Sequence, residues 1–131
     1  MDPTEFYRQI VESIREEDVH AVAGVMAGHV GEENLITLED LAIQAFGEYN
    51  ASTERKTREI LEKLTTEHHL PVCANSGRSG RWLARDAAER DKSAGELERR
   101  GNHTLDRARA LRMAVVPAKT LKRERQQSLW R

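Results

Sequence analysis

The chain is organised around residues 36–84, ITLEDLAIQAFGEYNASTERKTREILEKLTTEHHLPVCANSGRSGRWLA, which predict two short helices followed by a hairpin. Thr37 is a good N-cap, and Asp40 three residues later fits a capping-box pattern. Apolar side chains then recur at helical spacing until Gly47, which ends the first helix. We expect Ser52 to cap a second helix that runs from Thr53 to about His68.

The second predicted helix has one apolar and one polar face. Its apolar residues lie at helical spacing and should face the interior, whereas the basic segment near its start is left for solvent or a partner. Two helices joined by a short turn, with the second basic near its start, form a helix-turn-helix arrangement. The residues expected to face a partner are Arg55, Lys56, Thr57 and Arg58.

The segment after this helix predicts a β-hairpin. Residues 70–74 are an apolar run too short for a helix, residues 75–80 have the composition of a loop, and residues 81–84 return as a second short strand. A hairpin with a Gly-rich, Arg-bearing tip directly after such a helix resembles the wing of a winged helix-turn-helix domain. The order of the elements carries this resemblance, which covers about fifty of the 131 residues.

A narrower resemblance lies in EHHLPVCANSGRSGRWLA and the charged segment that follows it. This pattern is similar to small winged-helix proteins encoded by phages and prophages, in which an aromatic residue closes the hairpin, as Trp82 would here. The resemblance implies binding of double-stranded DNA by a regulator or an accessory replication factor. The second helix would enter the major groove, and Arg78 and Arg81 in the wing would contact phosphates or the adjacent minor groove.

Composition bounds the class of protein. A chain of 131 residues suits one domain with a core, and its hydrophobic fraction of 38% and charged fraction of 33% indicate a well-solvated surface or a charged partner. Cys73 is the only cysteine, so it cannot form an intrachain disulfide, and its apolar surroundings favour a buried structural thiol. We find neither a signal peptide nor an apolar run of membrane-spanning length, and therefore expect a cytoplasmic protein.

The net charge of −1 conceals an asymmetry. Residues 1–76 hold six Lys/Arg against fifteen Asp/Glu, a balance of −9, whereas residues 77–131 hold fifteen against seven, a balance of +8. Such a split indicates binding of a polyanion by one part of the molecule. The alternative is that the acidic and basic parts pair with each other, within one chain or between chains.

Four segments divide the chain in this interpretation. Residues 1–33 form an N-terminal helical segment, residues 34–85 the winged helix-turn-helix, residues 86–116 a long C-terminal helical extension, and residues 117–131 a basic tail. Within the extension, residues 94–111 carry a thin apolar stripe of the kind that a dimerising helix presents, and we expect it to bind a second chain; the alternative is that it packs against the chain's own first helices. The stripe includes Ala94, Leu97, Leu105, Ala108 and Leu111.

Enzymatic chemistry has little support. The loop NSGRSG lacks the spacing and the Lys-Ser/Thr of a phosphate-binding loop, and the five histidines show no metal-ligand spacing. We therefore expect no catalytic residue, metal, cofactor or small-molecule ligand. The sequence predicts a mainly α protein with a small hairpin that binds double-stranded DNA without catalysis, or alternatively a winged-helix protein-interaction module. The expected core comprises Leu38, Leu41, Ile60, Leu61, Leu64, Val72 and Leu83.

Overall fold

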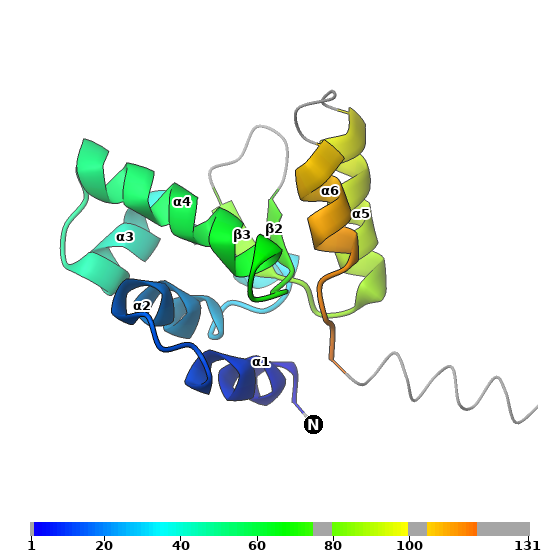
Figure 1. Ribbon diagram of the computed structural model, residues 1–131, viewed down its shortest axis with the longest axis horizontal. Coiled ribbons are helices and arrows are strands. Elements are labelled where there is room, and N and C mark those ends of the chain that lie inside the picture. Colours follow the sequence, from blue (N-terminus) through cyan, green and yellow to red (C-terminus); the bar gives the residue numbers. More distant parts are fainter. Residues whose placement is uncertain (1, 75–79, 100–104, 118–131) are drawn as a thin grey trace, which may run out of the picture.

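The computed structural model describes residues 2–74, 80–99 and 105–117, and shows a mainly helical fold with a small antiparallel sheet (Figure 1). The mainly α prediction is thereby confirmed. No helix in the described part of the chain is long and apolar enough to cross a bilayer. In chain order the elements are α1 (Pro3–Glu12), α2 (Glu17–Met26), the 3-10 turn η1 (Glu32–Asn34), β1 (Ile36–Thr37), α3 (Leu38–Phe46), α4 (Ala51–Thr66), β2 (Val72–Ala74), β3 (Gly80–Leu83), α5 (Ala87–Arg99) and α6 (Leu105–Arg112).

The N-terminal helices pack onto the rest of the fold through more than their apolar stripes. Asp2 caps α1 by accepting a hydrogen bond from the Thr4 amide. Tyr7 is fully buried, and its hydroxyl donates to the carbonyl oxygen of Ala84 at 2.5 Å, which ties α1 to the residue that follows β3. No local pattern in the sequence indicates this contact, because the two residues lie 77 positions apart along the chain.

Helix α2 ends at Met26, and residues that follow it join the sheet. The amide of Gly31 donates to the carbonyl of Leu83 at 2.9 Å, and the amide of Leu83 donates to the carbonyl of His29 at 2.9 Å. Gly31 has a φ of 94°, a conformation that glycine adopts without the strain another residue would incur.

Local capping signals define α3 and α4. The Thr37 hydroxyl accepts the amide of Asp40 at 3.1 Å, and Gly47 ends α3 in the left-handed region at φ 84°, both as predicted. The start of α4 differs from the prediction, because Asn50 rather than Ser52 is its N-cap. Asn50 and Thr53 form a reciprocal capping box in which each side chain accepts the other residue's amide at 2.9 Å.

The sheet contains a strand that the sequence did not reveal. Its order is β1-β3-β2 with antiparallel pairing throughout, so the predicted hairpin β2–β3 gains the two-residue strand β1 on the far side of β3. Trp82 lies opposite Cys73, and Ile36 lies opposite Arg81. A two-residue strand is too short to show an alternating pattern, which explains why periodicity missed it.

The expected core is confirmed. Helices α1 to α4, β3 and the adjoining loops enclose one continuous apolar cluster, in which Leu41, Leu64 and Leu83 are fully buried. Six of the seven predicted core residues lie in this cluster, and the seventh, Val72, is partly buried and packs against it.

The C-terminal extension is not one long helix. It forms α5 and α6, which lie side by side as a helical hairpin beside the sheet and α4 (Figure 1). Ala94, Ala108 and Leu111 from the predicted dimer stripe are buried within the chain's own fold. This intrachain packing accounts for the stripe that motivated a homodimer through residues 94–111, and the homodimer stays a prediction that light scattering can test.

Candidate nucleic-acid interface

The candidate interface begins at the N-terminal half of α4, which follows α3 after a short turn (Figure 1). Ala51 and Ser52 in the first turn and Arg55 one turn later are all exposed. Arg55 contacts no carboxylate among the described residues. Free amides at the start of a helix and an unpaired guanidinium beside them are both suited to contact phosphate or base edges.

Lys56 is held against the neighbouring helices rather than left free. Its ammonium group lies 2.5 Å from a carboxylate oxygen of Asp18 on α2, and 4.9 Å from the ring centroid of Phe46 on α3. The two contacts place its charge beside an acid and over an aromatic face. Lys56 would have to leave Asp18 before it could bind a phosphate.

Thr57 does not belong to the interface. The sequence placed it on the partner-facing side of the second helix, but its side chain is fully buried and its hydroxyl donates to the carbonyl of Thr53 at 2.7 Å. The reason is the helical period, which puts residue 57 on the same face as the buried Ile60, Leu61 and Leu64. The sequence already shows this spacing, so the burial of Thr57 could have been predicted from it.

Arg58 is exposed but paired within its own helix. Its guanidinium donates to Oε1 of Glu54 at 3.0 and 3.2 Å, and the Tyr49 hydroxyl donates to Oε2 of the same carboxylate at 3.1 Å. The hydrogen bond to Glu54 raises the pKa of Tyr49 above its ordinary value. Glu54 thus orients both side chains at the entrance to α4.

The hairpin contributes Arg81 to the described surface. Arg81 is half-buried, and its guanidinium donates to the carbonyl of Gly80 at 3.0 Å. Arg78, the other arginine expected to contact DNA, lies outside the described residues. Among the described residues, Arg55 and Arg58 therefore lie on α4, and Arg81 lies on β3.

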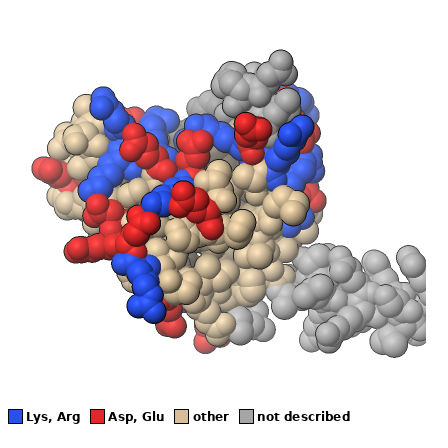
Figure 2. Space-filling model, viewed as in Figure 1, with Lys and Arg blue, Asp and Glu red and all other residues tan. Residues whose placement is uncertain are grey.

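Ion pairs join the basic groups to acids from other elements. Two lysines of α4 bind acids in or next to α2, and three basic residues of the second half of the chain bind acids of the first half. Figure 2 accordingly shows positive and negative side chains interspersed over the surface around α4. The pairs are Lys56–Asp18, Lys63–Glu16, Arg85–Glu33, Lys92–Glu32 and Arg107–Glu62.

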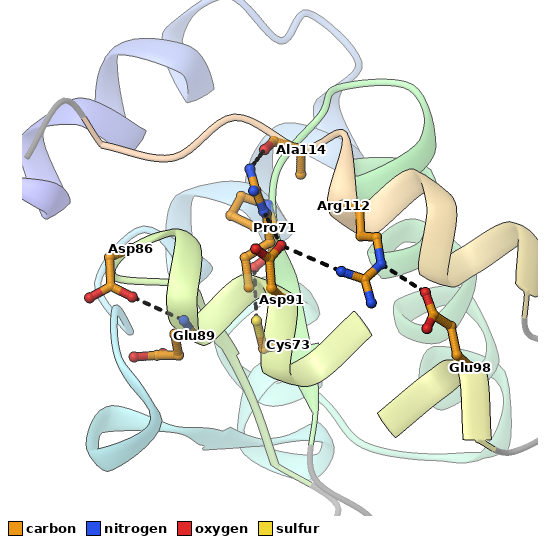
Figure 3. Close-up of polar contacts among 9 residues, drawn as sticks. Pro71, Cys73, Asp86, Glu89, Asp91, Glu98, Arg112 and Ala114 are labelled. Carbon is orange, nitrogen blue, oxygen red and sulfur yellow. Dashed lines mark hydrogen bonds and ion pairs between the residues drawn. The ribbon is translucent and has the colours of Figure 1, made fainter. Parts of the chain in front are cut away.

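Burial raises the pKa of three titratable groups, Tyr7, Cys73 and Glu89. Burial raises the pKa of the Cys73 thiol to about 12, so the thiol stays protonated at neutral pH and is a poor nucleophile. Burial also raises the pKa of Tyr7, and of Glu89 on α5. Cys73 donates to the carbonyl of Pro71 (Figure 3), and the described residues contain no group of three His, Cys, Asp or Glu that could hold a metal ion.

Sequence reasoning missed two residues that shape this region. Ser93 on α5 bonds both backbone groups of Ala74, accepting from its amide at 3.3 Å and donating to its carbonyl at 3.4 Å. Arg107 on α6 reaches Glu62 on α4. Both act across elements far apart in the chain, so no local pattern could have revealed them.

Comparison of the chain with protein-family models, curated proteins and solved structures finds no match.

Proposed function

We propose that this chain is a winged helix-turn-helix protein that binds double-stranded DNA without catalysis, as a phage-type regulator or accessory replication factor. The N-terminal half of α4 would enter the major groove, and the β2–β3 hairpin would act as the wing. The single observation that carries the proposal is the exposed start of α4, where Arg55 and Arg58 face solvent.

The order of the elements supports this proposal. Helix α2, the short strand β1, the pair α3–α4 and the hairpin β2–β3 follow one another, and β3 lies between β1 and β2 in the sheet. This arrangement leaves one long face of α4 outside the core, next to the hairpin. A helix exposed along one face, beside a hairpin bearing Arg81, suits simultaneous contact with a groove and the flanking backbone.

The mixed charge on the outward face of α4 limits the expected affinity for DNA. Glu59 and Glu62 are exposed on the same helix as Arg55 and Arg58, so the face carries charges of both signs. Such a surface favours DNA less than a uniformly basic one does. We therefore expect moderate affinity that depends strongly on salt, with the N-terminal turn of α4 making the closest approach.

The test is fluorescence anisotropy with a labelled random-sequence duplex across a series of salt concentrations. We expect wild-type binding to weaken as salt rises, and Arg55→Ala to weaken binding and lower the salt slope by about one, as for the loss of one phosphate contact. Arg8→Ala is the matched control, because Arg8 is exposed on α1, which is not part of the proposed DNA-contacting surface. This variant should leave the affinity for the duplex and the salt slope unchanged.

Two further variants distinguish a phosphate contact from a contact to a base edge. Arg78→Ala should weaken all duplexes about equally, because a phosphate contact carries no sequence information. Arg58→Ala should lose about 1–3 kcal/mol on a preferred site and less on random DNA if it reads a base edge. A wild-type protein that shows no salt-dependent binding to any duplex would remove the DNA proposal.

A protein-interaction module is the second candidate. It is favoured by the pairing of basic residues with the acidic first half of the chain, as in Arg85–Glu33, Lys92–Glu32 and Arg107–Glu62. These pairs use cations that a DNA-binding surface would leave free. If the duplex experiment fails while the protein remains folded, this candidate takes the place of DNA binding.

A further inference from the structure

A groove with a volume of about 170 Å³ opens between α4, the β2–β3 hairpin and the α5–α6 hairpin. Its walls are largely apolar, with Leu61 and Leu111 almost fully buried and Val72 and Leu97 half-buried. In Figure 1, α4 and α6 lie on either side of the strands. The groove shares Arg58 and Arg81 with the proposed DNA-contacting surface.

Three arginines from three elements line this groove. Arg58 comes from α4, Arg81 from β3 and Arg107 from α6, whereas Glu62 is the only carboxylate among the described lining residues. Arg107 lies 3.3 Å from Glu62, and its side chain remains 56% exposed. A guanidinium has five N–H donors, so one ion pair leaves donors for a second acceptor.

The groove combines the two features of a site for a small organic acid. A preformed cavity of about 150 Å³ with apolar walls is large enough for one benzene ring. Ligand sites usually add a few polar groups to such walls, and guanidinium groups match carboxylates in geometry and charge.

We propose that this groove binds a free small-molecule carboxylate whose apolar body is about the size of one six-membered ring. The ring would lie against the half-buried Val72 and Leu97, above the buried Leu61 and Leu111, and the carboxylate would be bound by Arg107 in competition with Glu62. Inorganic anions fit less well, because they leave the apolar walls unused. The proposal does not rest on DNA binding, although Arg58 and Arg81 line the groove and also belong to the proposed DNA-contacting surface.

Isothermal titration calorimetry of the full chain, without DNA, tests the proposal with benzoate as probe. We expect benzoate to bind, and benzamide and acetate each to bind at least about tenfold more weakly, because the first lacks the charge and the second lacks the ring. Equal affinity for benzamide would overturn the role of the arginines. Equal affinity for acetate would overturn the role of the apolar walls, and an absence of benzoate binding would overturn the whole proposal.

Matched arginine variants locate the site. Arg107→Gln should weaken benzoate binding about tenfold, as for the loss of a charged hydrogen bond. Arg109→Gln should leave it unchanged, because Arg109 is exposed on the same helix and does not line the groove. As a second measurement, benzoate should shift the amide resonances of Thr66, Val72 and Ser93 in wild-type protein. Shifts confined to α1, or equal affinity of the Arg107 variant, would overturn the assignment.

Discussion

The α2–α4 region and the α5–α6 hairpin are held in place by different forces. In the first, large apolar side chains such as Met26, Leu41 and Leu64 are fully buried in one continuous cluster. In the second, the side chains buried completely are mostly small, such as Ala94 and Ala108, and polar contacts do much of the joining. Burial of apolar area is the larger stabilising term, so we expect the first region to set global stability.

The polar contacts of the hairpin show how it is fastened. Arg112 on α6 donates to Glu98 at 2.7 Å and lies 4.0 Å from Asp91, both on α5 (Figure 3). Arg90 donates to the carbonyl of Ala114 at 2.9 Å, and the amide of Val115 donates to the carbonyl of His69 at 2.9 Å. Each of the two hydrogen bonds to a backbone carbonyl contributes about 1 kcal/mol, and the exposed ion pairs of Arg112 add little. The hairpin should therefore open without unfolding the core.

The largest effect should come from the core. Leu64→Ala should lower the free energy of unfolding by about 2–5 kcal/mol, because it leaves a cavity among fully buried side chains. Urea denaturation measures this, and Leu64→Met, which conserves volume, should cost less than about 1.5 kcal/mol. A loss below about 1 kcal/mol for Leu64→Ala would contradict the assignment of Leu64 to the core.

A truncation in the hairpin should act locally. Leu111→Ala should destabilise α5–α6 by about 2 kcal/mol or more, because Leu111 is one of the few large side chains buried there. Hydrogen exchange should then speed up at least tenfold in α6 while α2 and α3 keep their protection. Met113→Ala is the control, since Met113 is 77% exposed. If α2 loses protection together with α6, the two regions unfold as one unit.

A smaller effect is expected at the edge of the sheet. β2 is an edge strand, and Ser93 satisfies both the amide and the carbonyl of Ala74. Ser93→Ala should lower stability by about 1 kcal/mol and increase the exchange rate of the Ala74 amide. Unchanged exchange at Ala74 would show that α5 does not protect this edge in solution.

The smallest effect should depend on pH. The hydrogen bond from Arg112 lowers the pKa of Glu98 below its ordinary value of 4.5. Because the folded pKa is depressed, the stabilisation is fully present above pH 4.5 and is lost as pH falls through the folded pKa. The difference between the melting temperatures at pH 7 and pH 3 should be slightly smaller for Glu98→Gln than for wild type. An identical difference would mean that this exposed pair contributes nothing, as many surface pairs do.

Local signals in the sequence predicted the central helices and their core. Thr37 caps the start of α3 and Gly47 caps its end, because helix capping depends on residues within one turn of the helix end. Leu61 and Leu64 are buried because helical spacing places them on one face. Local signals also have limits. Asn50 and Ser52 are both capable N-caps, and the reciprocal contact with Thr53 selected Asn50.

The features that bear most on function depend instead on residues far apart in the chain. The sequence revealed an acidic first half and a basic second half, but only the tertiary structure decided that Arg85 and Arg107 pair with acids of the first half. The same holds for the groove, whose arginines come from α4, β3 and α6. Caps and periodicity act within a few residues, whereas ion pairs and grooves form wherever the folded chain brings distant side chains together.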